Sequence, residues 1–272
     1  MNLENYFISQ FKSSHIGDDG AFIDGYVYST DAFFENIHFK REWMTHYQIA
    51  SKAMVVNISD AIAMGAKPIY ALLSIAMPKD ITKSQMKELS KGFQDIANRY
   101  DIDIIGGDTI SNTKLDINIT IISKTDKPLK RVGVKDNFLV AYTGKLGDSK
   151  KDLGKLMNLG KIHKNSKFVK IELRDKFIDN SKRFLVSGMD ISDGLFSDLG
   201  KIADINNTGF RFDKKISKNI GCSGEEYEML VVFDKRDRKA VLRRAKLTRT
   251  KLNIFATTQR KKYSNRCKAH HF

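Results

Sequence analysis

Apolar residues in the first half of the chain switch between strand and helix spacing. Strands are predicted at 26–29, 69–77, 102–105 and 115–121. Helices are predicted at 45–65 and 82–100, where apolar residues share one helical face. Thr45 is a suitable N-cap for the first helix, and Gly65 ahead of Pro68 ends it. Because the predicted strands end at Ser29-Thr30-Asp31 and at Gly106-Gly107-Asp108, we expect turns at both places.

The second half repeats this alternation. Strands are predicted at 138–143, 210–212, 227–233 and 252–256, and helices after Asp148, at 175–184, between Gly194 and Asn207, and in a basic stretch after Phe233. The segment 124–136 is polar and contains Pro128, which favours a domain junction there. We therefore expect an α/β (α+β) fold with domains at 1–134 and 135–272.

Composition narrows the class of protein. The chain has 272 residues, 41% of them hydrophobic and 29% charged, which is enough for one large or two modest domains. The sequence contains no apolar run as long as a membrane span, and its first residues lack a signal-peptide pattern. Cys222 and Cys267 are the only cysteines and have no metal-ligand spacing. We expect reduced thiols in a cytoplasmic enzyme that has no membrane partner.

Positive charge is concentrated near the C-terminus. The formal net charge is +15, and fourteen Lys or Arg against two Asp between Asp234 and Lys268 account for +12 of it. A nucleic-acid-binding module is one interpretation of such a cluster. However, Val241, Leu242 and Ala245 interrupt the cluster at helical spacing, which favours a folded helix with one solvated face.

Five short acidic motifs lie along the chain, and each places aspartate beside Gly, Ser or Thr. They occupy 17–21, 29–31, 57–60, 106–109 and 190–194. Aspartate in such pairs is common in turns and caps, but this series in a basic protein favours convergence on Mg²⁺, which prefers oxygen ligands. Asp60 is the most informative, because it lies in an apolar helix where an unpaired carboxylate is costly. The sequence therefore predicts a Mg-nucleotide site.

Several nucleotide-binding classes are excluded. The chain lacks the Gly-x-x-x-x-Gly-Lys-Ser/Thr pattern of P-loop kinases and the His-Arg-Asp and Asp-Phe-Gly patterns of protein kinases. Gly106-Gly107-Asp108 is too short for a dinucleotide-binding fingerprint. We therefore expect ATP to be held through metal ions and a few basic groups.

In their order, these motifs resemble the thiamine-monophosphate kinase family, which shares a superfamily with aminoimidazole ribonucleotide synthetase and selenophosphate synthetase. The most specific stretches are 29–31 with His38 seven residues later, 56–60 running into 63–66, 105–109, 189–195 and 223–228. The resemblance implies ATP-dependent phosphorylation of thiamine monophosphate to thiamine diphosphate. It also implies two α/β domains of the aminoimidazole ribonucleotide synthetase-like type and a homodimer whose N-terminal strands form a β-barrel.

The same resemblance assigns site residues. Several Mg²⁺ ions are expected on Asp19, Ser29, Thr30, Asp31, Asp60, Asp108, Asp190 and Asp193, of which Asp60, Asp108 and Asp190 are the catalytic candidates. Contacts to ATP are expected from Tyr100, Gly107, Asp108, Arg131 and Ser192. Contacts to thiamine monophosphate are expected from His38, Glu225 and Phe272. At the C-terminus, His270 stands where the family carries aspartate.

Two alternatives remain open. One is another ATP-dependent enzyme of the superfamily, although selenophosphate synthetases usually carry a reactive N-terminal cysteine or selenocysteine and this chain has no Cys before Cys222. An aminoimidazole ribonucleotide synthetase would not be expected to have the Ser-Thr-Asp segment followed by His38. The other alternative is the nucleic-acid-binding module, which gives no reason for the ordered aspartates.

Overall fold

The computed structural model describes residues 3–268, which form two five-stranded sheets. The first sheet has the order β1-β2-β5-β3-β4, and only β3 and β4 pair in parallel. Its strands are β1 (Ala21–Ile23), β2 (Tyr26–Phe34), β3 (Lys67–Pro78), β4 (Asp103–Asn112) and β5 (Asp116–Lys124), and a short helix α1 (Leu3–Ile8) precedes them. The strands predicted at 69–77 and 115–121 are confirmed as β3 and β5.

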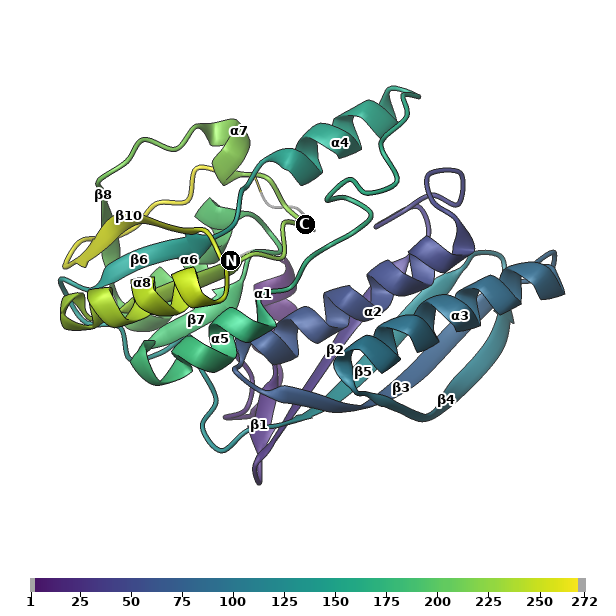
Figure 1. The fold of residues 1–272 in the computed structure, drawn as a ribbon, viewed down its shortest axis with the longest axis horizontal. Coiled ribbons are helices and arrows are strands. Elements are labelled where there is room, and N and C mark those ends of the chain that lie inside the picture. The colour runs from purple at the N-terminus through teal and green to yellow at the C-terminus, as the bar shows by residue number, and fades with distance from the viewer. Residues whose placement is uncertain (1–2, 269–272) are drawn as a thin grey trace.

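Two long helices cover one face of this sheet. They are α2 (His46–Ala63) and α3 (Lys83–Tyr100), which lie side by side over the strands (Figure 1). Each begins with a capping box, in which Thr45 or Thr82 accepts a hydrogen bond from the backbone of a glutamine three residues later and that glutamine's side chain accepts from the cap backbone. Both predicted helices are confirmed, including the cap at Thr45.

The second sheet is antiparallel and has the order β7-β9-β6-β10-β8. Its strands are β6 (Leu139–Thr143), β7 (Ser187–Asp190), β8 (Gly209–Phe212), β9 (Met229–Phe233) and β10 (Leu252–Gln259). The helices of this half are α4 (Asp148–Met157), α5 (Asp175–Ser181), α6 (Leu195–Asn206), α7 (Lys218–Gly221) and α8 (Arg238–Leu247), with 3₁₀ turns η1 (Lys182–Phe184) and η2 (Lys235–Asp237). These match the elements predicted for the second half, with β7 and α7 as additions.

Helix α2 joins the two sheets into one packed body. It runs along the middle of the molecule (Figure 1), and thirteen of its eighteen residues are buried. One apolar cluster contains α2 residues such as Ile58 together with Ile119 of β5 and Val231 of β9. Because helices and sheets must bury their apolar faces, α2 serves both halves at once. Side chains of this helix are therefore placed at the junction between the two sheets.

Two expected turns are wrong. Ser29-Thr30-Asp31 lies inside β2, which continues to Phe34, and Gly106-Gly107-Asp108 lies inside β4, which continues to Asn112. Gly107 has φ +149° and lies against β3, where a Cβ atom would come 1.7 Å from the carbonyl oxygen of Leu73. The glycine pair therefore allows close strand pairing, and it does not mark the end of a strand.

The expectation of reduced thiols is also wrong for this structure, because Cys222 and Cys267 form a disulfide. The sequence separation of 45 residues gave no sign that the last described segment returns to α7.

The basic helix predicted after Phe233 is confirmed as α8, whose Val241 and Ala245 are buried while the charged positions face outward. Within residues 3–268, no helix is long and apolar enough to span a membrane.

Candidate metal and nucleotide site

Three aspartates from distant parts of the chain converge at the junction between the sheets. Asp19 lies just before β1, Asp60 in the last turns of α2, and Asp190 at the end of β7. One carboxylate oxygen from each lies within 4.8 Å of the others. We refer to Asp19, Asp60 and Asp190 as the carboxylate triad. Three oxygen ligands at this spacing fit a hard divalent cation.

Polar residues of α2 hold the elements around the triad. Ser59 donates a hydrogen bond of 2.6 Å to Asp190 Oδ2, which ties α2 to the end of β7. Asn57 accepts a hydrogen bond of 2.8 Å from the backbone nitrogen of Asp31, which ties α2 to β2. Both Asn57 and Ser59 are fully buried. The acidic motif 57–60 is therefore the part of the helix that fixes the neighbouring strands in place.

The triad is electrostatically unfavourable without a cation. Burial raises the pKa of Asp60 well above its usual value, and the nearby charges of Asp31, Asp190 and Asp19 raise it further. Burial and the charge of Asp19 likewise raise the pKa of Asp190 well above its usual value. A carboxylate that resists ionisation in the protein becomes ionised readily when a divalent cation lies beside it.

Arg131 supplies the positive charge nearest to the triad. Its guanidinium forms an ion pair with Asp19, and its backbone nitrogen donates a hydrogen bond of 2.8 Å to Asp18 Oδ1. Burial raises the pKa of Asp19, and Arg131 opposes this effect. Arg131 is one cation against three acids, so the triad retains an excess of negative charge whenever its carboxylates are ionised.

Two buried oxygen atoms beside this cluster also lack a partner. Among the described residues, Asp19 Oδ2 and Ser29 Oγ have no hydrogen-bond partner, although both atoms are inaccessible to solvent. Buried polar atoms in folded proteins are nearly always partnered, so an orphaned oxygen needs an explanation. A cation at the triad would satisfy such oxygens. The residues present therefore fit the Mg²⁺ that the sequence predicts.

Other predicted ligands lie around the triad. Asp31 is tied to α2 by its backbone hydrogen bond to Asn57, and its charge contributes to the raised pKa of Asp60. Asp193 forms an ion pair of 2.7 Å with Lys201, which also binds Asp198 at 3.0 Å. Burial raises the pKa of Asp198 to about 7. The Lys201 ion pairs thus form a second acidic group beside the triad, which the sequence prediction included only through Asp193.

A further group of predicted residues lies away from the triad within one chain. Asp108 is exposed on β4, which is three strands from β2 and therefore about 14 Å away at the usual strand spacing. Gly107 lies beside it. The Thr30 side chain points to the exposed face of the sheet, where it bonds Asn118. Tyr100 lines a different cavity of about 350 Å³ with Ile62.

Two of the residues predicted to contact thiamine monophosphate are each held by a hydrogen bond with a backbone group. His38 accepts a hydrogen bond of 3.0 Å from the Phe34 backbone nitrogen through Nδ1, and its ring stacks on Phe33. The Glu225 backbone nitrogen donates a hydrogen bond of 2.7 Å to the Ser192 carbonyl, which holds Glu225 close to the 190–194 loop. The predicted contact Phe272 lies outside the described residues.

Lys52 is a residue that the sequence prediction missed. It lies on α2, its side chain is 1% exposed, and its Nζ is 2.9 Å from Glu225 Oε2. The signal that could have identified it is the one used for Asp60, namely a charged residue within the apolar face of a helix.

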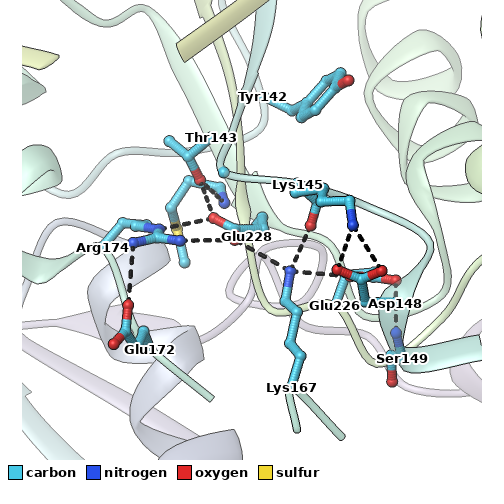
Figure 2. Close-up of polar contacts among 12 residues, drawn as sticks. Tyr142, Thr143, Lys145, Asp148, Ser149, Lys167, Glu172, Arg174, Glu226 and Glu228 are labelled. Atoms are coloured by element: carbon cyan, nitrogen blue, oxygen red, sulfur yellow. Dashed lines mark hydrogen bonds and ion pairs between the residues drawn. The ribbon is translucent and has the colours of Figure 1, made fainter. Parts of the chain in front are cut away.

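A second group of buried carboxylates has a different character. Glu228 accepts hydrogen bonds from both Nε and Nη2 of Arg174 at 2.8 Å and from the Thr143 hydroxyl at 2.7 Å (Figure 2). Lys167 bridges Glu228 and Glu226 at 3.1 and 2.9 Å. Burial acts to raise the pKa of Glu228, but Arg174 and Lys167 hold it below its usual value. This group, the Glu226/Glu228 network, is already neutralised by the protein itself.

Comparisons with known proteins first identify the class. The sequence model for the N-terminal domain of AIR synthase related proteins matches residues 17–125. A solved structure described as AaThiL complexed with AMPPCP and TMP superposes with a TM-score of 0.86 at 22% identity, covering 99% of this chain and 96% of that chain. The fold is therefore that of the aminoimidazole ribonucleotide synthetase-like proteins.

Sequence relatives then identify the family. Thiamine-monophosphate kinase of Buchnera aphidicola subsp. Schizaphis graminum is 35% identical, with 85% of this chain and 83% of the relative covered. Thiamine-monophosphate kinase of Bacillus subtilis is 34% identical over 70% of this chain, and the match spans 63% of that relative's length. The chain belongs to the thiamine-monophosphate kinase family, as the ordered motifs predicted.

Proposed function

We propose that the chain transfers the terminal phosphoryl group of ATP to the phosphate of thiamine monophosphate, giving thiamine diphosphate and ADP. The carboxylate triad is the observation that carries this proposal, because its three closely spaced acids, of which Asp190 is buried and the others partly buried, need a divalent cation to become ionised together. The family assignment supplies the acceptor.

The triad residues would hold Mg²⁺, with Asp31, Asp108 and Asp193 as further acidic ligands and Ser29 and Thr30 as additional oxygen donors. When bound, Mg²⁺ neutralises the charge of two phosphate groups that otherwise repel each other. The protein provides the positions of these oxygens, and α2 fixes them through Asn57 and Ser59. Positioning and charge neutralisation are the main contributions that phosphoryl transfer requires from a protein.

Arg131 is suited to a phosphate of ATP, because its planar guanidinium can bind two oxygens at once. In the structure it binds Asp19, so a phosphate and a cation would together replace that pair. Tyr100, Gly107 and Ser192 are proposed as further nucleotide contacts. A general base is not required, since the attacking oxygen of a phosphate monoester is already ionised near neutral pH.

We further propose that the chain acts as a homodimer through the exposed face of the first sheet. Tyr28, Leu72 and Ile110 are exposed there, on the side opposite α2 and α3. Exposed apolar side chains on one face of a sheet are typical of an interaction surface. Asp108 lies two residues before Ile110 on β4, and side chains two residues apart point to the same face of a strand. Its proposed role as a metal ligand therefore depends on the contact between the two chains of the dimer.

An assay of product formation tests the function. Purified protein is incubated with ATP, MgCl₂ and thiamine monophosphate, and thiamine diphosphate and ADP are quantified by chromatography. Equal amounts of both are expected, with no product after EDTA treatment or with unphosphorylated thiamine as acceptor. ADP release without thiamine diphosphate at every Mg²⁺ concentration would overturn the proposal and favour another acceptor within the superfamily.

A further inference from the structure

Lys52 is a buried cation in an aromatic cage. We define the Lys52 cage as Phe33 of β2, Phe168 of the segment between α4 and α5, and Glu225 ahead of β9. The ammonium lies 3.8 Å from the Phe168 ring centroid, 5.6 Å from that of Phe33 and 2.9 Å from Glu225 Oε2. Both aromatic contacts are within cation–π range.

The cage joins the two halves of the molecule. Lys52 and Phe33 belong to the first half, whereas Phe168 and Glu225 belong to the second. Lys167 anchors the segment that carries Phe168, because its Nζ donates to the Lys145 carbonyl and pairs with Glu228 (Figure 2). Glu225 is therefore held against α2 by its ion pair with Lys52 and against the second half by its backbone bond to Ser192.

Stability alone does not account for this arrangement. Removing an ammonium from water is costly, and replacing a buried ion pair by apolar residues of similar volume is often neutral or stabilising. Glu225 is 24% exposed while Lys52 is 1% exposed, so the pair lies at the edge of a solvent-accessible space. A charged pair in this position is better explained by a role in binding, because the Glu225 carboxylate is accessible to a ligand in the solvent-accessible space.

The cage lies at a suitable distance from the triad. Lys52 precedes Asp60 by eight positions on α2, which corresponds to about 12 Å along the helix and about 80° around it. His38 stacks on Phe33, so both predicted acceptor contacts, His38 and Glu225, meet at this cage. An acceptor with its phosphate at the triad would extend its rings along α2 towards Lys52.

We propose that Lys52 is a positioning residue that sets acceptor specificity by orienting Glu225. Lys52 binds Oε2, and the other carboxylate oxygen, Oε1, is then presented as a hydrogen-bond acceptor to the amino group of the thiamine pyrimidine. Because Lys52 neutralises the carboxylate, the pair recognises a hydrogen-bond donor and not merely a positive charge. This inference rests on the proposed function, since it names how the acceptor ring is selected.

The test compares two acceptors. One is thiamine monophosphate and the other is its analogue with an oxo group in place of the pyrimidine amino group. A site built to pair with a donor rejects an analogue that lacks it, so we expect the wild type to prefer the amino form by about 100-fold or more in kcat/KM. Lys52→Met should reduce this preference to less than about fivefold and raise KM for thiamine monophosphate about tenfold, with kcat and KM for ATP changed less than about threefold.

A double-mutant cycle separates positioning from direct contact. If Lys52 acts through Glu225, Lys52→Met/Glu225→Gln should lose no more discrimination than Glu225→Gln alone. If the loss of discrimination in the double variant equals the product of the losses in the two single variants, Lys52 contacts the acceptor directly, and the positioning role is overturned. If Lys52→Met does not fold, the double variant, which leaves no unpaired buried charge, is compared with Glu225→Gln, in which the Phe33 and Phe168 rings still contact the Lys52 ammonium.

Two controls complete the design. Lys155→Met removes a lysine from a solvent-facing pair with Asp152 and should leave discrimination and both KM values unchanged. If the wild type forms no thiamine diphosphate, the proposed function fails and this inference fails with it. If the wild type is active and Lys52→Met retains full discrimination, only this inference fails.

Discussion

The protein buries two groups of carboxylates, and they differ in what compensates their charge. In the Glu226/Glu228 network, Arg174, Lys167 and the Thr143 hydroxyl satisfy Glu228, whose pKa is held below its usual value. In the carboxylate triad, burial raises the pKa of Asp60 and Asp190 well above their usual values, and Arg131 binds only Asp19.

This difference separates structure from function. A carboxylate that the protein has neutralised stabilises the fold around it, and it offers no free oxygen to a ligand. A carboxylate group left with excess negative charge costs stability unless something outside the chain neutralises it. The network has two acids and the triad three, and both groups contain buried carboxylates, so the compensation and not the burial marks the triad as the ligand site.

The largest effect is expected from removing a triad charge. Asp60→Asn should lower kcat by about 1,000-fold or more, because a cation ligand is lost where two phosphates meet. Without Mg²⁺ the variant should be at least as stable as the wild type, since a buried anion has been removed. Steady-state rates at saturating Mg²⁺ and thermal unfolding provide the measurements. Near-normal turnover by Asp60→Asn would remove this residue from the site.

The opposite pattern is expected in the Glu226/Glu228 network. Glu228→Gln should destabilise the fold by about 3 kcal/mol, because Arg174 and Lys167 lose a buried partner. The turnover of the folded fraction should change much less than in Asp60→Asn. Denaturant unfolding of both variants checks this, and a Glu228→Gln protein of wild-type stability would contradict the structural role.

The pH dependence of this loss follows from the pKa. Because the pKa of Glu228 is lowered in the folded protein, its stabilising effect is present above the unfolded value of about 4.5 and is lost as the pH falls through the folded value. The stability difference between wild type and Glu228→Gln should therefore be constant from pH 7 to pH 5 and shrink below about pH 4.5. Unfolding curves recorded across this range measure the difference.

Much of this architecture could be predicted from sequence, and the parts that could not have physical reasons. Helices α2 and α3 were predictable because local caps and apolar spacing agree with their final packing. The segments 29–31 and 106–108 are predicted as turns but lie in strands, because small polar residues favour turns locally. Their pairing with β5 and β3 is set by contacts distant in sequence.

The same limit applies to the site. The ordered motifs and the family resemblance led to Asp19, Asp60 and Asp190, which the structure brings together. No local pattern reveals that Lys52 meets Glu225, 173 residues away, or that Cys222 meets Cys267. Such partners are fixed by the path of the chain through space, which spacing along the sequence does not contain.

The stabilisation of the fold by Mg²⁺ should also distinguish the carboxylate triad from the Glu226/Glu228 network, with an effect smaller than that of the substitutions above. Added to the wild type without nucleotide, it should stabilise the fold by up to about 2.7 kcal/mol at 100 times its Kd. The raised pKa values of Asp60 and Asp190 mean that protons compete with the metal, so the stabilisation should grow as the pH rises from 5 to 8. Glu228→Gln should retain this response and Asp60→Asn should lose most of it. Equal responses in the two variants would place the cation elsewhere.

The smallest effect is expected from the charge that is not buried at all. Residues 234–268 carry a balance of +12, yet α8 buries only Val241 and Ala245 and keeps its basic side chains except the half-buried Arg244 in solvent. Solvent and salt already compensate these charges, so they should speed the approach of anionic substrates and not form a site.

Arg243→Glu/Lys246→Glu should lower kcat/KM by less than about fivefold at low salt, and the difference should vanish near 0.5 M salt, where screening is strong. An RNA-binding assay across the same salt series addresses the nucleic-acid alternative. Sub-micromolar RNA affinity at physiological salt, lost in this double variant, would show that the exposed basic residues form a ligand site. The rule that solvent-compensated charge does not form a site would then fail for this surface.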